Sequence, residues 1–162
     1  MASSFTVNET YGTSPGTSVD TSYVNLLSAS IASGSDTTTV PNANPIAIPA
    51  AGSAYSYERW IRGHWTGSFS SITSITFWKY SGSLGTGVTL NAGLVASQTY
   101  ATPVVTASAI ATSGIPTSQG AGLTPTYGSN YCYYIVLQLV VGTTASSGSI
   151  GTMDYRYGWN EV

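Results

Sequence analysis

Charged side chains are scarce in this sequence. Asp, Glu, Lys and Arg make up 6% of its 162 residues, and the formal net charge is -2. Soluble domains usually hold about 25% charged residues, and a protein free in the cytosol normally keeps a charged surface to stay in solution. We therefore expect this chain to reside inside an assembly or on an exterior surface.

Basic residues are too few for a nucleic-acid interface. The four are Arg59, Arg62, Lys79 and Arg156, and they cannot form the dense stripe that neutralises phosphates. No segment reaches the ~18 apolar residues of a membrane helix, and the N-terminus "MASSFTVNET" lacks the basic and apolar regions of a secretory signal. With Met1 as the start, we predict synthesis in the cytoplasm, no membrane and no nucleic-acid partner.

Cysteine and histidine each occur once. Cys132 lies among tyrosines in an apolar run, which favours a buried thiol over a reactive one. His64 alone excludes a histidine-rich metal centre, and no cysteine or carboxylate lies at ligand spacing beside it. We predict that His64 is a structural hydrogen-bonding residue, and we expect no metal and no cofactor.

One motif has the spelling of a hydrolase elbow, Gly-x-Ser-x-Gly, in "GTSPG" at 12–16. In an elbow, the residue after the serine donates its backbone N–H to the oxyanion. Here that residue is Pro15, which has no N–H, so a turn is the better interpretation. The spacing of the carboxylates indicates no acid–base pair either. We predict no catalytic residues and no enzymatic activity.

Short alternating runs bounded by Gly, Pro, Ser and Asn fill most of the chain, and helical periodicity is almost absent. The pattern predicts an all-β protein, a single domain over 1–162 that is a β-sandwich or jelly roll. About eight short strands are expected, at 3–9, 23–31, 54–66, 71–80, 87–95, 98–111, 130–141 and 150–160. The run at 130–141 is apolar on both faces, which predicts burial on both.

Segment 32–53 holds three prolines and little alternation, which predicts an extended arm or long loop. Because proline fixes φ, such an arm is already extended before it meets a partner. We expect it to reach a neighbouring subunit or another partner protein, with Val40, Ile46 and Ile48 as apolar anchors.

Residues 57–80 hold three of the four tryptophans, three of the four Lys and Arg residues, and the only histidine. Strand periodicity places Trp60, Arg62 and His64 on one face. The favoured interpretation is structural, with these three lining a second buried surface, under a loop or against another subunit. The alternative is a sugar-binding platform that uses Tyr57, Trp60 and Trp65, or the tyrosines of 131–134.

Four phrases resemble small β-rich structural proteins of tailed phages, of the capsid decoration or minor capsid type. They are "FTVNETYG", "SYERWIRGHWTGSFSSITSITFWKYSGSLGTG", "TYATPVVTASAIATSGIPTS" and "YIVLQLVVGTTASSGSIGTMDYRYGWNEV". The resemblance spans most of the chain and implies no catalytic residue. It implies a homo-oligomeric virion component, such as a trimer, on the capsid surface, with the major capsid protein and its own copies as partners. The last hairpin also looks like the closing strands of immunoglobulin-like surface domains.

The sequence is compatible with three functions. The leading hypothesis is a non-enzymatic decoration or cement protein that binds the outside of a phage head and stabilises it. The first rival is a carbohydrate-binding or adhesive module. The second rival is a subunit of an extracellular filament, in which the arm completes a neighbour's sheet.

Overall fold

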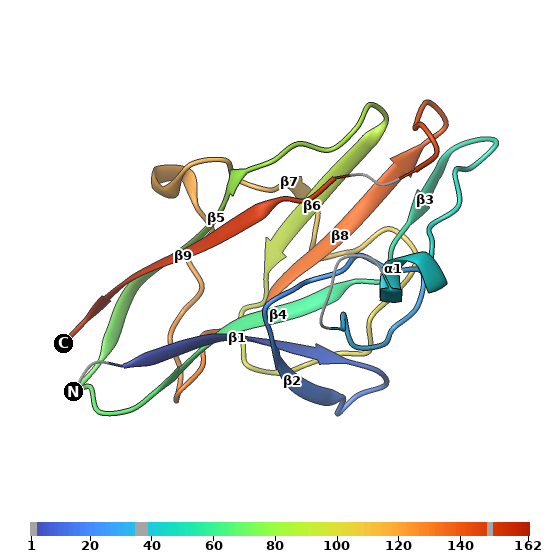
Figure 1. The fold of residues 1–162 in the computed structure, drawn as a ribbon. Coiled ribbons are helices and arrows are strands. Elements are labelled where there is room, and N and C mark those ends of the chain that lie inside the picture. The colour runs from blue at the N-terminus through green and yellow to red at the C-terminus, as the bar shows by residue number, and fades with distance from the viewer. Residues whose placement is uncertain (1–2, 35–38, 149–150) are drawn as a thin grey trace.

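The computed structural model describes residues 3–34, 39–148 and 151–162. Within them the chain forms nine strands, one short α-helix and one short 3-10 helix (Figure 1). In chain order the strands are β1 (Ser4–Tyr11), β2 (Thr17–Thr21), β3 (Ser53–Tyr55), β4 (Arg59–Thr66), β5 (Ile72–Ser81), β6 (Val88–Leu94), β7 (Ser113–Gly114), β8 (Ile135–Gly142) and β9 (Asp154–Glu161). The helices are α1 (Thr39–Ala43) and η1 (Gln119–Ala121). The predicted all-β sandwich is confirmed.

Two antiparallel sheets make up the sandwich. The larger sheet has the order β2-β1-β4-β8-β6-β7, and β3 also pairs with β8. Strands β5 and β9 form the smaller sheet and run side by side in Figure 1. The start of β1 lies near the end of β9, where the backbone N–H of Ser3 donates to Glu161 Oε1 at 3.0 Å.

The main core lies between the two sheets. It contains alternate residues of β8, namely Ile135, Leu137 and Leu139, which pack with Phe77 of β5. The opposite face of β8 is buried as well, because Val136 and Gln138 are at most 1% exposed. The predicted burial of this run on both faces is therefore confirmed for residues 135–139.

A second core covers the outer face of the larger sheet. Trp60, Tyr100, Tyr134 and Val136 pack together there, beneath the loop that follows β6. A third core, at the end of the sandwich where β1 begins and β9 ends, holds Trp65, Ile72, Ile75 and Cys132.

Two predicted strands are wrong, namely 23–31 and 98–111, since both segments are irregular loops. Neither segment pairs with a neighbouring strand, and several of their backbone groups bond to buried side chains. In the first loop, the carbonyl groups of Ala29 and Ile31 accept from Arg59. In the second, the N–H of Ser108 donates to Gln138 Oε1.

The predicted strand 54–66 is interrupted. Residues 56–58, which connect β3 to β4, are not part of a strand. The N–H of Ser56 still donates to the Leu139 carbonyl of β8 at 3.0 Å. Strand β2 was not predicted, because its sequence, TSVDT, is polar. The turn predicted at 12–16 is confirmed, since it joins β1 to β2 and the N–H of Gly16 donates to the Thr13 carbonyl.

The segment 32–53, predicted as an extended arm or long loop, is a long loop that contains α1 in its described part. Pro41 lies in the first turn of this helix, where its missing N–H costs no hydrogen bond. Further along, the carbonyl of Asn44 accepts from the N–H of Ser28 at 3.1 Å, and Ile46 packs against the main core. The described part of the loop therefore lies along its own subunit, with Ile48 left 41% exposed.

No α-helix in the described ranges is long and apolar enough to cross a bilayer.

Candidate functional site

Two ionisable side chains inside the protein, those of Arg59 and Glu9, form a buried ion pair. Arg59 Nη1 lies 3.2 Å from Glu9 Oε1, and both side chains are at most 1% exposed. The carboxylate of Glu9 also accepts from the N–H of Ser33 at 2.9 Å and from its hydroxyl at 2.8 Å. Burial lowers the pKa of Arg59, and the charge of Glu9 offsets part of that shift. The pair fastens the loop after β2 to the larger sheet, so it serves the fold.

A second buried carboxylate, Glu58, fastens the loop that covers the outer face. It accepts hydrogen bonds from Trp60 Nε1 at 3.1 Å, from the N–H of Val104 at 3.3 Å and from the hydroxyl of Ser108. Trp60 is only 2% exposed beneath this loop. The surface that covers Trp60 therefore belongs to the same chain, and the indole does not reach the exterior.

Cys132 is a buried thiol, as predicted. Burial raises its pKa to about 12, although a hydrogen bond from the Gly63 N–H to Sγ at 3.0 Å works in the opposite direction. The thiol is therefore neutral at physiological pH and unsuited to nucleophilic attack.

One group of polar and aromatic side chains lies together on the outer face of the larger sheet, and we name it the outer-face cluster. It consists of Thr6, Asn8, Asp20, Arg62, His64 and Tyr131. Strand register explains how most of it assembles, because Asn8 pairs with both Asp20 and Arg62, and Thr6 pairs with His64. Since alternate residues of a strand share a face, β1, β2 and β4 present these side chains on the same side of the sheet.

Asp20 is held firmly within the outer-face cluster. Its carboxylate accepts from Asn8 Nδ2 and from Thr6 Oγ1, each at 3.0 Å, and His64 Nδ1 lies 3.5 Å away. Partial burial alone would raise the pKa of Asp20, but the two hydrogen bonds and the charge of a protonated His64 lower it below its ordinary value. The side chain of Asp20 is nevertheless 45% exposed.

Tyr131 contacts two members of the cluster, His64 and Arg62. Its ring stacks on His64 with the centroids 4.3 Å apart and the planes 12° apart. The guanidinium carbon of Arg62 lies 3.8 Å from the centroid of the same ring, within the range of a cation–π interaction. This contact immobilises Arg62 and orients the tyrosine ring.

A recess of about 360 Å³ adjoins Asp20. It opens where β2 separates from β1, beyond the last paired residues, Val7 and Thr21. Its lining residues are Phe5, Thr6, Val7, Asp20, Thr21 and Ser22.

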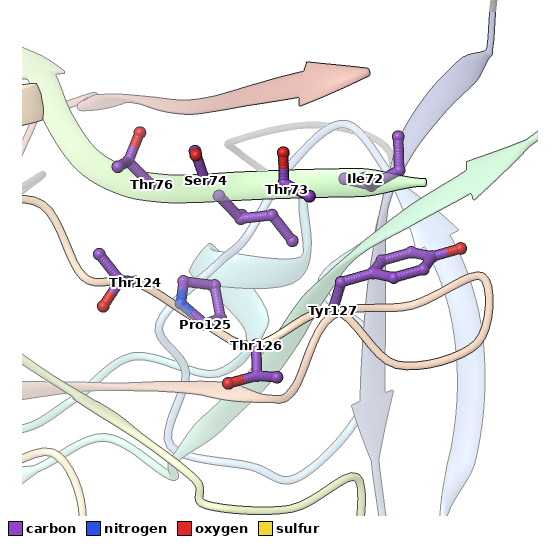
Figure 2. A pocket seen from close by; sticks show the side chains of 9 residues that line it. Ile72, Thr73, Ser74, Thr76, Thr124, Pro125, Thr126 and Tyr127 are labelled. Carbon is purple, nitrogen blue, oxygen red and sulfur yellow. The ribbon is translucent and has the colours of Figure 1, made fainter. Parts of the chain in front are cut away.

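A second recess, of about 410 Å³, lies between β5 and residues 124–127 (Figure 2). Phe77 and Leu123 exchange backbone hydrogen bonds at its closed end, and the next antiparallel pair in that register is Ile75 with Pro125. Because proline has no N–H, the ladder stops and the two edges separate. No ionisable side chain except the phenol of Tyr127 lines this recess, so it offers little for acid–base chemistry.

The structure separates the six candidate interface residues into three places. Arg62 and His64 meet in the outer-face cluster, whereas Trp60 is buried beneath a loop. Ile46 packs against the main core, Val40 is half-buried, and Ile48 is exposed. Sequence reasoning did not single out Asp20, Thr6 or Asn8. The alternation of "FTVN" at 5–8 was a signal for Thr6 and Asn8.

No three His, Cys, Asp or Glu side chains in the described part of the chain lie close enough together to hold a metal ion. In comparisons with known proteins, no family model matches this chain, and no curated protein or solved structure matches it either.

Proposed function

We propose that this chain is a non-enzymatic structural protein of a virus particle, a decoration subunit that binds the outside of a tailed-phage head and stabilises it. The supporting observation is the burial of several charged residues. Of the six acidic and four basic residues, Glu9, Glu58 and Arg59 are buried. The surface is therefore even poorer in charge than the sequence, which suits a subunit that has much of its surface covered by partners.

Apolar side chains on the exterior support the same proposal. Exposed large apolar residues include Val19, Tyr23, Ile31, Ile48, Tyr80, Val104 and Val105, each at least 39% exposed. Aromatic residues are enriched at protein interfaces and charged residues are depleted at their centres. A surface of hydroxyl groups and apolar side chains therefore favours attachment through contact area and shape.

The subunit is compact without a partner. Its accessible surface is 7968 Å², close to the roughly 7,700 Å² expected for a single folded chain of this mass. The described part of the loop at 32–53 therefore adds no long projection, and Ile48 is its most exposed apolar anchor. We propose that this side of the sandwich, carrying Ile48, faces the head.

Ile48→Asp is expected to lower occupancy on heads at least tenfold. The melting temperature should stay within a few degrees of wild type, because the side chain is already exposed. The measurement is cosedimentation with purified heads of a tailed phage. Val105→Asp is the matched control, since Val105 is 43% exposed but lies in the loop after β6. Equal losses from both variants would contradict attachment through Ile48, and failure of the wild type to bind would contradict the proposed function.

Self-association is expected for the purified wild-type chain at micromolar concentration, because its charge-poor surface gains from being covered. Sedimentation velocity measures this directly. A monomer at every concentration, with no affinity for heads, would contradict an assembled role.

A second function, a carbohydrate-binding or adhesive module, is favoured by one specific observation. The outer-face cluster joins the only histidine, one of four basic residues, an exposed carboxylate and a tyrosine.

A further inference from the structure

Strand β2 forms one end of the larger sheet and has an open edge. It pairs with β1 only, and Figure 1 shows it beside β1 at the rim of the sandwich. In the described part of the chain, no backbone hydrogen bond joins β2 to any other segment. The opposite end of the sheet is β7, which has only two residues. Strand β2, with five residues, is therefore the longer of the two ends.

The register of the sheet determines which backbone groups of β2 point outward. On β4, the C=O of Gly63 accepts a hydrogen bond from the segment before β8, on the side away from β1. Its partner on β1, Val7, therefore directs its backbone groups toward β2, where it pairs with Thr21. Because these directions alternate along an antiparallel strand, Ser18 and Asp20 turn their N–H and C=O groups to the open edge.

These four outward groups are self-complementary about a two-fold axis. When β2 of a second copy lies antiparallel with the axis at Val19, Ser18 of each copy faces Asp20 of the other. Each such pair exchanges two backbone hydrogen bonds. All four outward groups of both copies are then paired, and Thr17 faces Thr21 at the two ends of the strand. A contact in which the same strand serves both copies is the usual form of a two-fold interface.

The side chains of β2 allow a second strand to approach. The strand has no lysine, no proline and no bulge, which are common devices that protect an edge strand from pairing. Its one charged residue, Asp20, is drawn over its own sheet, because Thr6 and Asn8 of β1 each donate to the carboxylate at 3.0 Å. In the two-fold register Asp20 faces Ser18, so like charges do not lie directly opposite each other.

Exposed apolar side chains lie beside the same edge. Val19 is exposed at the position of the axis, and Tyr23 is exposed just after the strand. Ile31, also exposed, has its carbonyl bonded to Arg59, which pairs with Glu9. Glu9 is the residue of β1 that lies opposite Val19, so Ile31 is close to the β1–β2 pair. Association at this edge would therefore cover apolar surface as well as pair backbone groups.

We propose that two copies of this chain associate through β2, which joins their larger sheets into one continuous sheet across a two-fold axis. The partner is a second copy because the outward groups of the strand complement themselves over its whole length. This inference rests on the self-association proposed above and names its surface, which does not include Ile48. Since five paired residues bury little area, the isolated dimer is expected to be weak.

Sedimentation velocity over a concentration series measures the dissociation constant of the dimer. Ser18→Lys places an ammonium group opposite the partner's Asp20, whereas Ser18→Asp places two carboxylates opposite each other. Relative to Ser18→Ala, which loses the Thr10 contact without adding charge, the first variant should bind roughly tenfold more tightly and the second roughly tenfold more weakly, because each dimer contains two such pairs. All three should melt within a few degrees of wild type, since Ser18 is exposed.

Asn160→Lys and Asn160→Asp are the matched controls, because they make the same charge changes at an exposed position of β9. Both should associate as wild type does. Equal dissociation constants for the three Ser18 variants would overturn the proposal, and so would equally large effects at Asn160. A wild type that stays monomeric at every concentration would overturn it even if the chain binds heads. Ser18→Asp should still cosediment with heads, so failure of β2 pairing is distinguishable from failure of head attachment.

Discussion

Arg59→Ala is expected to lower the free energy of unfolding by about 3–5 kcal/mol, because it leaves the buried Glu9 carboxylate without its charged partner. Glu9 and Arg59 are at most 1% exposed, so water cannot replace the lost contact. The substitution also removes the donors to the carbonyl groups of Ala29 and Ile31, which hold the loop after β2. Urea unfolding followed by tryptophan fluorescence measures the change.

Two further variants identify the source of that loss. Arg156→Ala removes an exposed arginine that lies against Tyr80, and it should cost no more than about 1 kcal/mol. The double variant Glu9→Gln with Arg59→Met removes both charges and should cost less than Arg59→Ala alone, since no unpaired charge remains buried. If Arg59→Ala and Arg156→Ala cost the same, the ion pair is not what secures this loop.

Strands with a regular two-residue alternation could be predicted from the sequence. The runs that became β1, β5, β6, β8 and β9 place apolar side chains toward one layer, or toward both for β8, and the pattern records that directly. Strand β2 escaped prediction because it is an edge strand whose five residues are almost all exposed. Because β2 buries little surface, its sequence needs no alternation of apolar residues.

The two incorrect strands have a common physical cause. Segments 23–31 and 98–111 contain apolar residues because they cover the faces of the larger sheet, not because they belong to it. Their backbone groups bond to Arg59, Glu58 and Gln138. Polar residues of this kind usually lie on the surface, and nothing local in a sequence shows that these three are buried under loops.

The candidate site was predictable only in part. Strand periodicity places Arg62 and His64 on one face from β4 alone. Asp20 and Tyr131 are distant in the sequence and reach them through the β1–β2 pairing and through the bridge between His64 and Tyr131. Such contacts depend on which strands become neighbours, and that order follows from the whole fold.

Trp65→Ala is expected to lower the free energy of unfolding by about 3–5 kcal/mol, the usual cost of emptying a large aromatic site in a core. The side chain is 0% exposed and packs with the rings of Phe5 at 5.1 Å and Trp159 at 5.7 Å between centroids. These contacts join β4 to the ends of β1 and β9, so the loss should appear as a lower melting temperature in thermal unfolding.

Trp65→Phe is the informative companion to that variant. The indole Nε1 of Trp65 is buried with no hydrogen-bond partner among the described residues, so phenylalanine removes an unsatisfied donor while it keeps most of the packing. Its cost should stay below about 1.5 kcal/mol. A cost equal to that of Trp65→Ala would mean that the indole N–H has a partner, such as a buried water molecule.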